Sequence, residues 1–64
     1  MNNSNQNPYI GQTVVELIKL RSSVQDALYA YPYPEGDELK GLLRSLRLLT
    51  EAERVATKEK NFGV

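Results

Sequence analysis

A proline-rich stretch near the middle of the chain limits the possible folds more than any other feature. Residues 29–37 hold two of the three prolines, Pro32 and Pro34, and three of the four tyrosines. Proline lacks the N–H that a helix interior needs, and it disfavours helical geometry at the residue before it. Because these two prolines stand one residue apart, a helix arriving from the N-terminal side must stop here. The stretch therefore divides the chain into two arms of similar length.

The first arm carries a helical pattern, and we predict a helix over about residues 8–30. Two starts fit the rules for helix N-termini. Asn7 can act as the N-cap with Pro8 in the first turn, or Thr13 can act as the N-cap with Glu16 three residues later, at capping-box spacing. We favour the earlier start.

Apolar residues recur along this arm at spacings of three and four, which is typical of a helix face that packs against other helices. Arg21 is the one charged residue in the row. A long arginine side chain can bury its stem and keep its charged head at the edge of the contact. We favour that interpretation of Arg21 over a buried ion pair.

The second arm predicts a helix over about residues 36–60, after a turn at 31–36. Glu35, Asp37 and Glu38 surround its first turn, where the helix dipole and unpaired N–H groups favour negative charge. Thr50 and Glu53 repeat the capping-box spacing, so the helix could break there. We predict an unbroken helix, because neither glycine nor proline enforces a stop.

The chain is short, and its composition narrows the ways in which it can be stabilised. A chain of 64 residues buries only roughly 60% of its unfolded surface. It has no cysteine and no histidine, so disulfides and the usual structural zinc sites are excluded. Oligomerisation is the remaining way for a chain of this size to gain stability. We expect residues 1–6, which are polar and low in complexity, to be a disordered tail, and residues 7–62 to form one domain.

The predicted fold is all-α: an antiparallel two-helix hairpin that dimerises into a four-helix bundle. Each arm has an apolar face wider than one neighbouring helix can cover, and a two-fold pair of hairpins covers both faces. The residues predicted for the oligomer core share this face: Val14, Leu17, Val24, Leu28, Leu39, Leu42, Leu46 and Leu49.

The sequence offers little support for catalysis, so we predict a protein that is not an enzyme. Without histidine the usual base that activates a nucleophile is missing. The carboxylates alternate with lysine and arginine in the manner of a solvated helix surface, and we predict no catalytic, cofactor-binding or metal site. No stretch approaches the roughly 20 apolar residues of a membrane span, and the start does not resemble a secretory signal. We therefore expect a cytoplasmic protein without membrane contact.

Four basic residues on the second arm form a stripe that we call the basic stripe: Lys40, Arg44, Arg47 and Arg54. A stripe of this kind can bind phosphates without sequence preference. However, the eight acidic and eight basic side chains cancel, and nucleic-acid binders usually carry a strong positive field. We therefore favour a solvated face, with nucleic-acid binding as the alternative.

The tyrosines of the central stretch, Tyr29, Tyr31 and Tyr33, are candidates for contact with a partner. Tyrosine buries much area for little lost rotamer freedom, so it is common at binding hot spots. The competing interpretation, which we favour, is that these rings cover the end of the core and pack on Leu28, Leu39 and Leu42.

Together these features predict a small interaction or regulatory protein that acts as a homo-oligomeric hairpin and binds itself and another protein. Two alternatives remain. One is a nucleic-acid-associated regulator that uses the basic stripe. The other is a structural subunit whose apolar surface is completed by a larger assembly.

Overall fold

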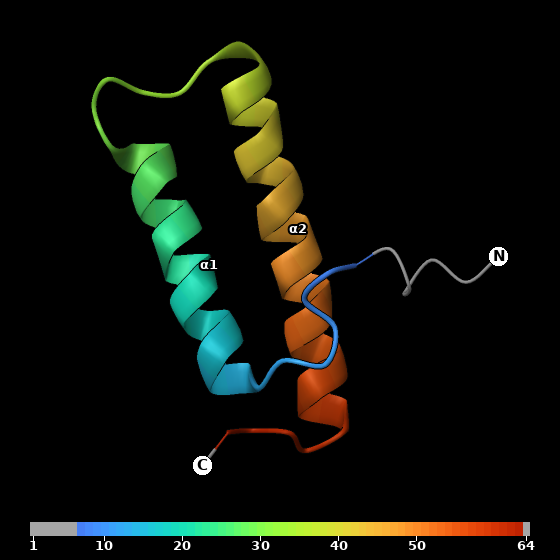
Figure 1. The fold of residues 1–64 in the computed structure, drawn as a ribbon. Coiled ribbons are helices and arrows are strands. Elements are labelled where there is room, and N and C mark those ends of the chain that lie inside the picture. Colours follow the sequence, from blue (N-terminus) through green and yellow to red (C-terminus); the bar gives the residue numbers. More distant parts are fainter. Residues whose placement is uncertain (1–6, 64) are drawn as a thin grey trace, which may run out of the picture.

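The computed structural model describes residues 7–63, and it shows two helices side by side in antiparallel order (Figure 1). Helix α1 comprises Val14–Tyr29 and helix α2 comprises Gly36–Lys58. The prediction of an all-helical hairpin is confirmed. The predicted disordered tail, residues 1–6, lies outside the described residues.

Helix α1 begins at Val14, so the predicted start near residue 8 is wrong. Thr13 is the N-cap, and both halves of the capping box are formed. The Glu16 N–H donates to Thr13 Oγ1 (3.2 Å), and the Thr13 N–H donates to Glu16 Oε1 (3.1 Å). Gly11 has φ 100°, which lies outside helical geometry and turns the chain before the helix can start.

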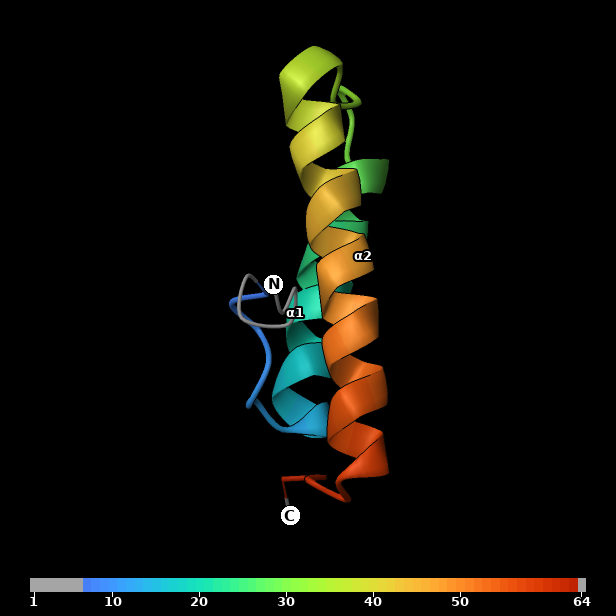
Figure 2. The same ribbon diagram turned by 90° about the vertical axis from the view of Figure 1, so that its right-hand side faces the viewer.

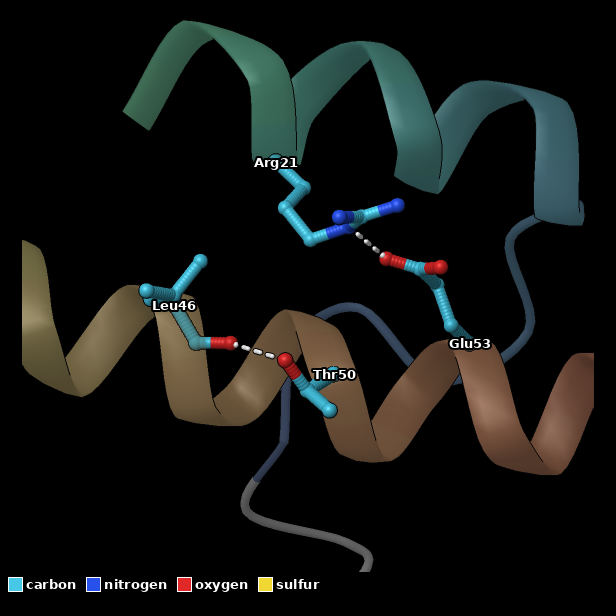
Figure 3. Close-up of polar contacts among 4 residues, drawn as sticks. All are labelled: Arg21, Leu46, Thr50 and Glu53. Atoms are coloured by element: carbon cyan, nitrogen blue, oxygen red, sulfur yellow. Dashed lines mark hydrogen bonds and ion pairs between the residues drawn. The ribbon is translucent and has the colours of Figure 1, made fainter. Parts of the chain in front are cut away.

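Helix α2 continues through Thr50 without a break, as predicted. The Thr50 hydroxyl donates to the Leu46 carbonyl oxygen at 2.8 Å, one turn back along the same helix (Figure 3). This side chain therefore bonds within the helix and does not cap a new one. The helix ends in a Schellman motif, in which the Asn61 N–H donates to the Ala56 carbonyl at 2.8 Å and Lys60 adopts φ 59°.

The hydrophobic core lies in the half of the hairpin away from the connecting loop. Among residues 7–63 its fully buried apolar side chains are Leu17 of α1 with Leu49, Ala52 and Ala56 of α2. Partly buried apolar side chains pack around this cluster: Tyr9, Ile10, Val14 and Val24. Of the residues predicted for an oligomer core, only Leu17 and Leu49 are fully buried within one chain.

The leucines near the loop are less well covered because α2 is the longer helix. It has 23 residues and α1 has 16, a difference of about 10 Å at 1.5 Å per residue. Figure 1 shows the first turns of α2 extending past the end of α1. Leu39 and Leu42 therefore remain half-buried, and Leu43 is 50% exposed.

The end of the hairpin opposite the loop is closed by two short segments. The Val14 N–H and Val15 N–H at the start of α1 donate to the carbonyls of Asn61 (2.9 Å) and Phe62 (3.2 Å). These bonds satisfy two N–H groups that have no partner within α1. The Asn61 side-chain amide in turn donates to the Gly11 carbonyl at 3.5 Å and the Gln12 carbonyl at 3.4 Å.

The N-terminal segment, residues 7–12, lies across one face of the helix pair (Figure 2). Asn7 is only 5% exposed. Its amide nitrogen donates to the Leu48 carbonyl (2.9 Å) and to Glu51 Oε1 (3.4 Å), and its Oδ1 accepts from the Tyr9 N–H (3.0 Å). This segment adds Tyr9 and Ile10 to the core, and it fixes which face of the hairpin they cover.

Arg21 forms an ion pair with Glu53 across the two helices, with Nε and Oε2 2.6 Å apart (Figure 3). The two side chains are 35% and 19% exposed. The arginine head therefore reaches a carboxylate at the edge of the helix contact, and the pair is not a buried one. Glu53 lies on α2 opposite Arg21 of α1. Residue spacing within one helix does not reveal such a pairing between two helices.

The hairpin is a single layer, with dimensions of 37 × 32 × 12 Å. Its smallest dimension is close to the diameter of one helix with side chains. Figure 2 shows α1 and α2 nearly in line when the layer is viewed along its edge. In the described part of the chain, neither helix combines the length and apolar character needed to cross a membrane.

Candidate interaction surface

The tyrosine loop, defined as Tyr29 with residues 30–35, projects its rings into solvent. Tyr29, Tyr31 and Tyr33 are 79%, 86% and 62% exposed. The interpretation of these rings as a cover for the core is therefore wrong for the single chain. The rings of Tyr31 and Tyr33 instead contact each other edge to face, with centroids 5.8 Å apart and planes at 89°.

Backbone geometry explains why these rings point outward. Ala30 ends α1 with φ −79° and ψ 133°, so the chain becomes extended immediately after Tyr29. Pro32 and Pro34 keep it from returning to a helix. The rings of Tyr31 and Tyr33 therefore stand on loop backbone beyond the end of α1, away from the buried cluster around Leu17 and Leu49.

The end of the hairpin that bears the tyrosine loop is acidic. Residues 22–39, which we call the loop-end region, contain four acidic residues and no basic residue. All four carboxylates are exposed: Asp26, Glu35, Asp37 and Glu38. The remaining side chains must therefore carry a net charge of +4, because the whole chain is neutral. The sequence total concealed this separation of charge.

The basic stripe lies on the side of α2 opposite the row that contacts α1. Lys40, Arg44, Arg47 and Arg54 are all exposed, as expected from the sequence. The only ion pair among residues 7–63 is the one between Arg21 and Glu53, so these four cations make no such pair there.

Two shallow hollows follow the basic stripe. One of about 310 Å³ is lined by Lys40, Leu43, Arg44 and Arg47. The other, of about 550 Å³, is lined by Leu43, Leu46, Arg47, Thr50, Glu51 and Arg54. Leu43 and Arg47 line both hollows, so the stripe has an exposed apolar residue among its cations. Sequence reasoning did not assign Leu43 to a binding surface, although its spacing from Lys40 and Arg47 places it on the same side of α2.

Sequence reasoning also did not identify Asn7 as a buried polar contact. It assigned Asn7 a capping role, and nothing in the local pattern indicates a contact with Leu48, 41 positions away.

Within residues 7–63, no three acidic side chains lie close enough together to hold a metal ion. The described surface offers groups for aromatic contact, apolar contact and charge pairing. Comparison with protein-family models, curated proteins and solved structures gives no match for this chain.

Proposed function

We propose that this chain is a small, cytoplasmic, non-enzymatic protein that acts as a homo-oligomeric helical hairpin and binds protein partners through the tyrosine loop. The observation that carries the proposal is the exposure of Tyr29, Tyr31 and Tyr33, at 62–86%. Rings held out by a proline-restricted loop lose little freedom on binding and bury a large area. The single-layer shape supports self-association, because one chain leaves leucines near the loop partly uncovered.

Light scattering combined with circular dichroism over a range of concentration tests the oligomer. We expect a helical species whose mass is a multiple of the chain mass of 7.2 kDa. A folded monomer at every concentration would contradict the homo-oligomer. A chain that stays largely unfolded would favour the alternative of a structural subunit completed by a larger assembly.

Replacing Tyr31 and Tyr33 with serine tests the loop. These side chains are mostly exposed, so we expect helix content to be retained and binding of protein partners to be lost. Ser22→Ala, an exposed change within α1, is the control for handling and folding. Loss of the helical fold in the tyrosine variant would instead indicate a structural role for the rings.

Nucleic-acid binding is a second candidate, and the observation that favours it is the basic stripe with its four exposed cations. Phosphate contacts release counterions, so such binding weakens steeply as salt increases. Retention on DNA or RNA at low salt, lost in Arg44→Glu with Arg47→Glu, would support this candidate. No retention at low salt would remove it.

A further inference from the structure

The charges of this molecule are separated in space although their sum is zero. The loop-end region carries four exposed carboxylates without a base, and the other side chains carry a net +4. The four cations of the basic stripe account for much of that excess, and they lie along α2 directly after the loop-end region. One chain therefore presents two neighbouring surfaces of opposite charge.

Each surface also contains exposed apolar groups among its charges. The loop-end region has the three tyrosine rings, and the basic stripe has Leu43, which is 50% exposed and lines both hollows. Arginine side chains favour the faces of aromatic rings, and leucine packs against them. The two surfaces are thus complementary in apolar contact as well as in charge.

We propose that the partner of the tyrosine loop is a second copy of this chain, whose basic stripe receives the loop-end region in an antiparallel, two-fold pair. This inference rests on the proposed function, and it names the partner and the surface. The occupant follows from charge complementarity, because every copy carries both surfaces in equal number. An antiparallel pairing of the α2 helices brings the acidic start of each helix beside the basic stripe of the other.

The symmetry makes the assembly finite. When two complementary surfaces meet head to tail in an open arrangement, further copies can add without limit. In a two-fold pair both surfaces of both copies are engaged at once, so the charges are compensated and no binding surface of this kind is left over. The contact also covers Leu43 and the tyrosine rings, which one chain leaves in solvent.

A charge-swap experiment on the full chain tests this arrangement. The first variant, Asp26→Lys with Glu35→Lys, makes the loop-end region neutral and the chain +4. The second variant, Arg44→Glu with Arg47→Glu, makes the chain −4. All four positions are exposed, and the carboxylates of Asp37 and Glu38 in the first turn of α2 remain. A third variant, Lys19→Glu with Lys60→Glu, also gives −4 and is the control for net charge, because Lys19 lies on α1 and Lys60 lies beyond the end of α2.

We expect each of the first two variants to self-associate at least about tenfold more weakly than the wild type by sedimentation equilibrium. Their equimolar mixture should associate more tightly than either variant alone, because the basic stripe of the first meets the acidic loop-end region of the second. The reversed contact joins a loop-end region and a stripe that are each neutral, so it neither attracts nor repels. The control variant should stay within about threefold of the wild type.

Two results would overturn the arrangement. If the swapped variants form oligomers as tight as the wild type, the docking surface is wrong while the homo-oligomer of the proposed function stands. If the mixture recovers no more affinity than either variant alone, the two surfaces do not meet. A wild-type chain that is monomeric at all concentrations would overturn both proposals, and circular dichroism on each variant confirms that the helices are intact.

Discussion

Lys60, two residues beyond the end of α2, has a backbone conformation that suits glycine better than lysine. Its φ is 59°, in the left-handed region where a Cβ atom is disfavoured by about 1 kcal/mol. We predict that Lys60→Gly raises the free energy of unfolding by about 0.5–1 kcal/mol, measured by urea denaturation. Ser22→Gly, at an exposed position inside α1, is the control and should lower it by roughly 0.5 kcal/mol. A loss of stability in Lys60→Gly would contradict the prediction.

The contribution of the ion pair between Arg21 and Glu53 to stability can also be measured directly. Both groups retain contact with water, so their coupling is modest. We predict a coupling free energy of about 0.5–1 kcal/mol in a double-mutant cycle that uses Arg21→Met and Glu53→Gln. The coupling should decrease at high salt. Additive effects of the two substitutions would mean that the contact does not stabilise the pair of helices.

At the scale of elements, Thr50 decides between one long helix and two short ones. Its hydroxyl bonds back to the Leu46 carbonyl inside α2, so it is not an N-cap. We predict that Thr50→Ala raises the free energy of unfolding by a few tenths of a kcal/mol, because alanine has the higher helix propensity. Loss of an N-cap would instead lower it by about 1 kcal/mol. The sign of the change in urea denaturation therefore distinguishes the two structures.

The N-terminal segment depends on Asn7 for its attachment. Three hydrogen bonds meet at this nearly buried side chain, two of them to α2. We predict that Asn7→Ala lowers the free energy of unfolding by about 1–3 kcal/mol, because the remaining polar groups lose their partner. Faster amide hydrogen exchange at Tyr9 and Ile10 should accompany the loss. Unchanged exchange at these residues would show that the segment is held by other contacts.

The elements themselves could largely be predicted from sequence, and the errors have physical causes. The prolines fixed the end of α1, and the absence of glycine or proline between Gly41 and Lys58 allowed α2 to run to Lys58. The start of α1 was missed because Thr13 with Glu16 and Asn7 with Pro8 are both valid local signals. Tertiary contacts decided between them, since Asn7 is used at Leu48 and Glu51 instead. Such contacts leave no trace in local spacing.

At the scale of the whole molecule, the core is small and confined to one half of the hairpin. A single core in a chain of this size rarely supplies more than about 3–5 kcal/mol. We predict that Leu49→Ala, which empties a fully buried position, costs about 2–5 kcal/mol and leaves much of the chain unfolded by circular dichroism. Leu43→Ala should cost less than about 1 kcal/mol, because its side chain is half exposed in the single chain. Equal losses at the two positions would contradict this division of the hairpin.

The candidate surface could be predicted only in part from sequence, because it too depends on how the two helices are arranged. The sequence identified Tyr29, Tyr31 and Tyr33 and the basic stripe, but it favoured a core role for the rings. Whether a ring beside a proline packs inward depends on where the shorter helix, α1, ends. Helix α1 has seven residues fewer than α2. The opposite charges of the two surfaces became visible only when the acidic positions were placed at one end.

The closure of the hairpin by its outer segments has a consequence for the order in which the chain folds. The bonds of Asn7 and Asn61 join residues 41 to 50 positions apart, so they form only when nearly the whole chain has been brought together. The chain loses the entropy of closing that long loop before these bonds form. The folding barrier is therefore higher than that of a hairpin whose stabilising contacts lie near its turn. The contacts around the central loop are local but weak, and those that stabilise the chain are distant in sequence. Folding is therefore limited by bringing the two ends of the chain together, and the proline-containing loop connects the helices without acting as the folding nucleus.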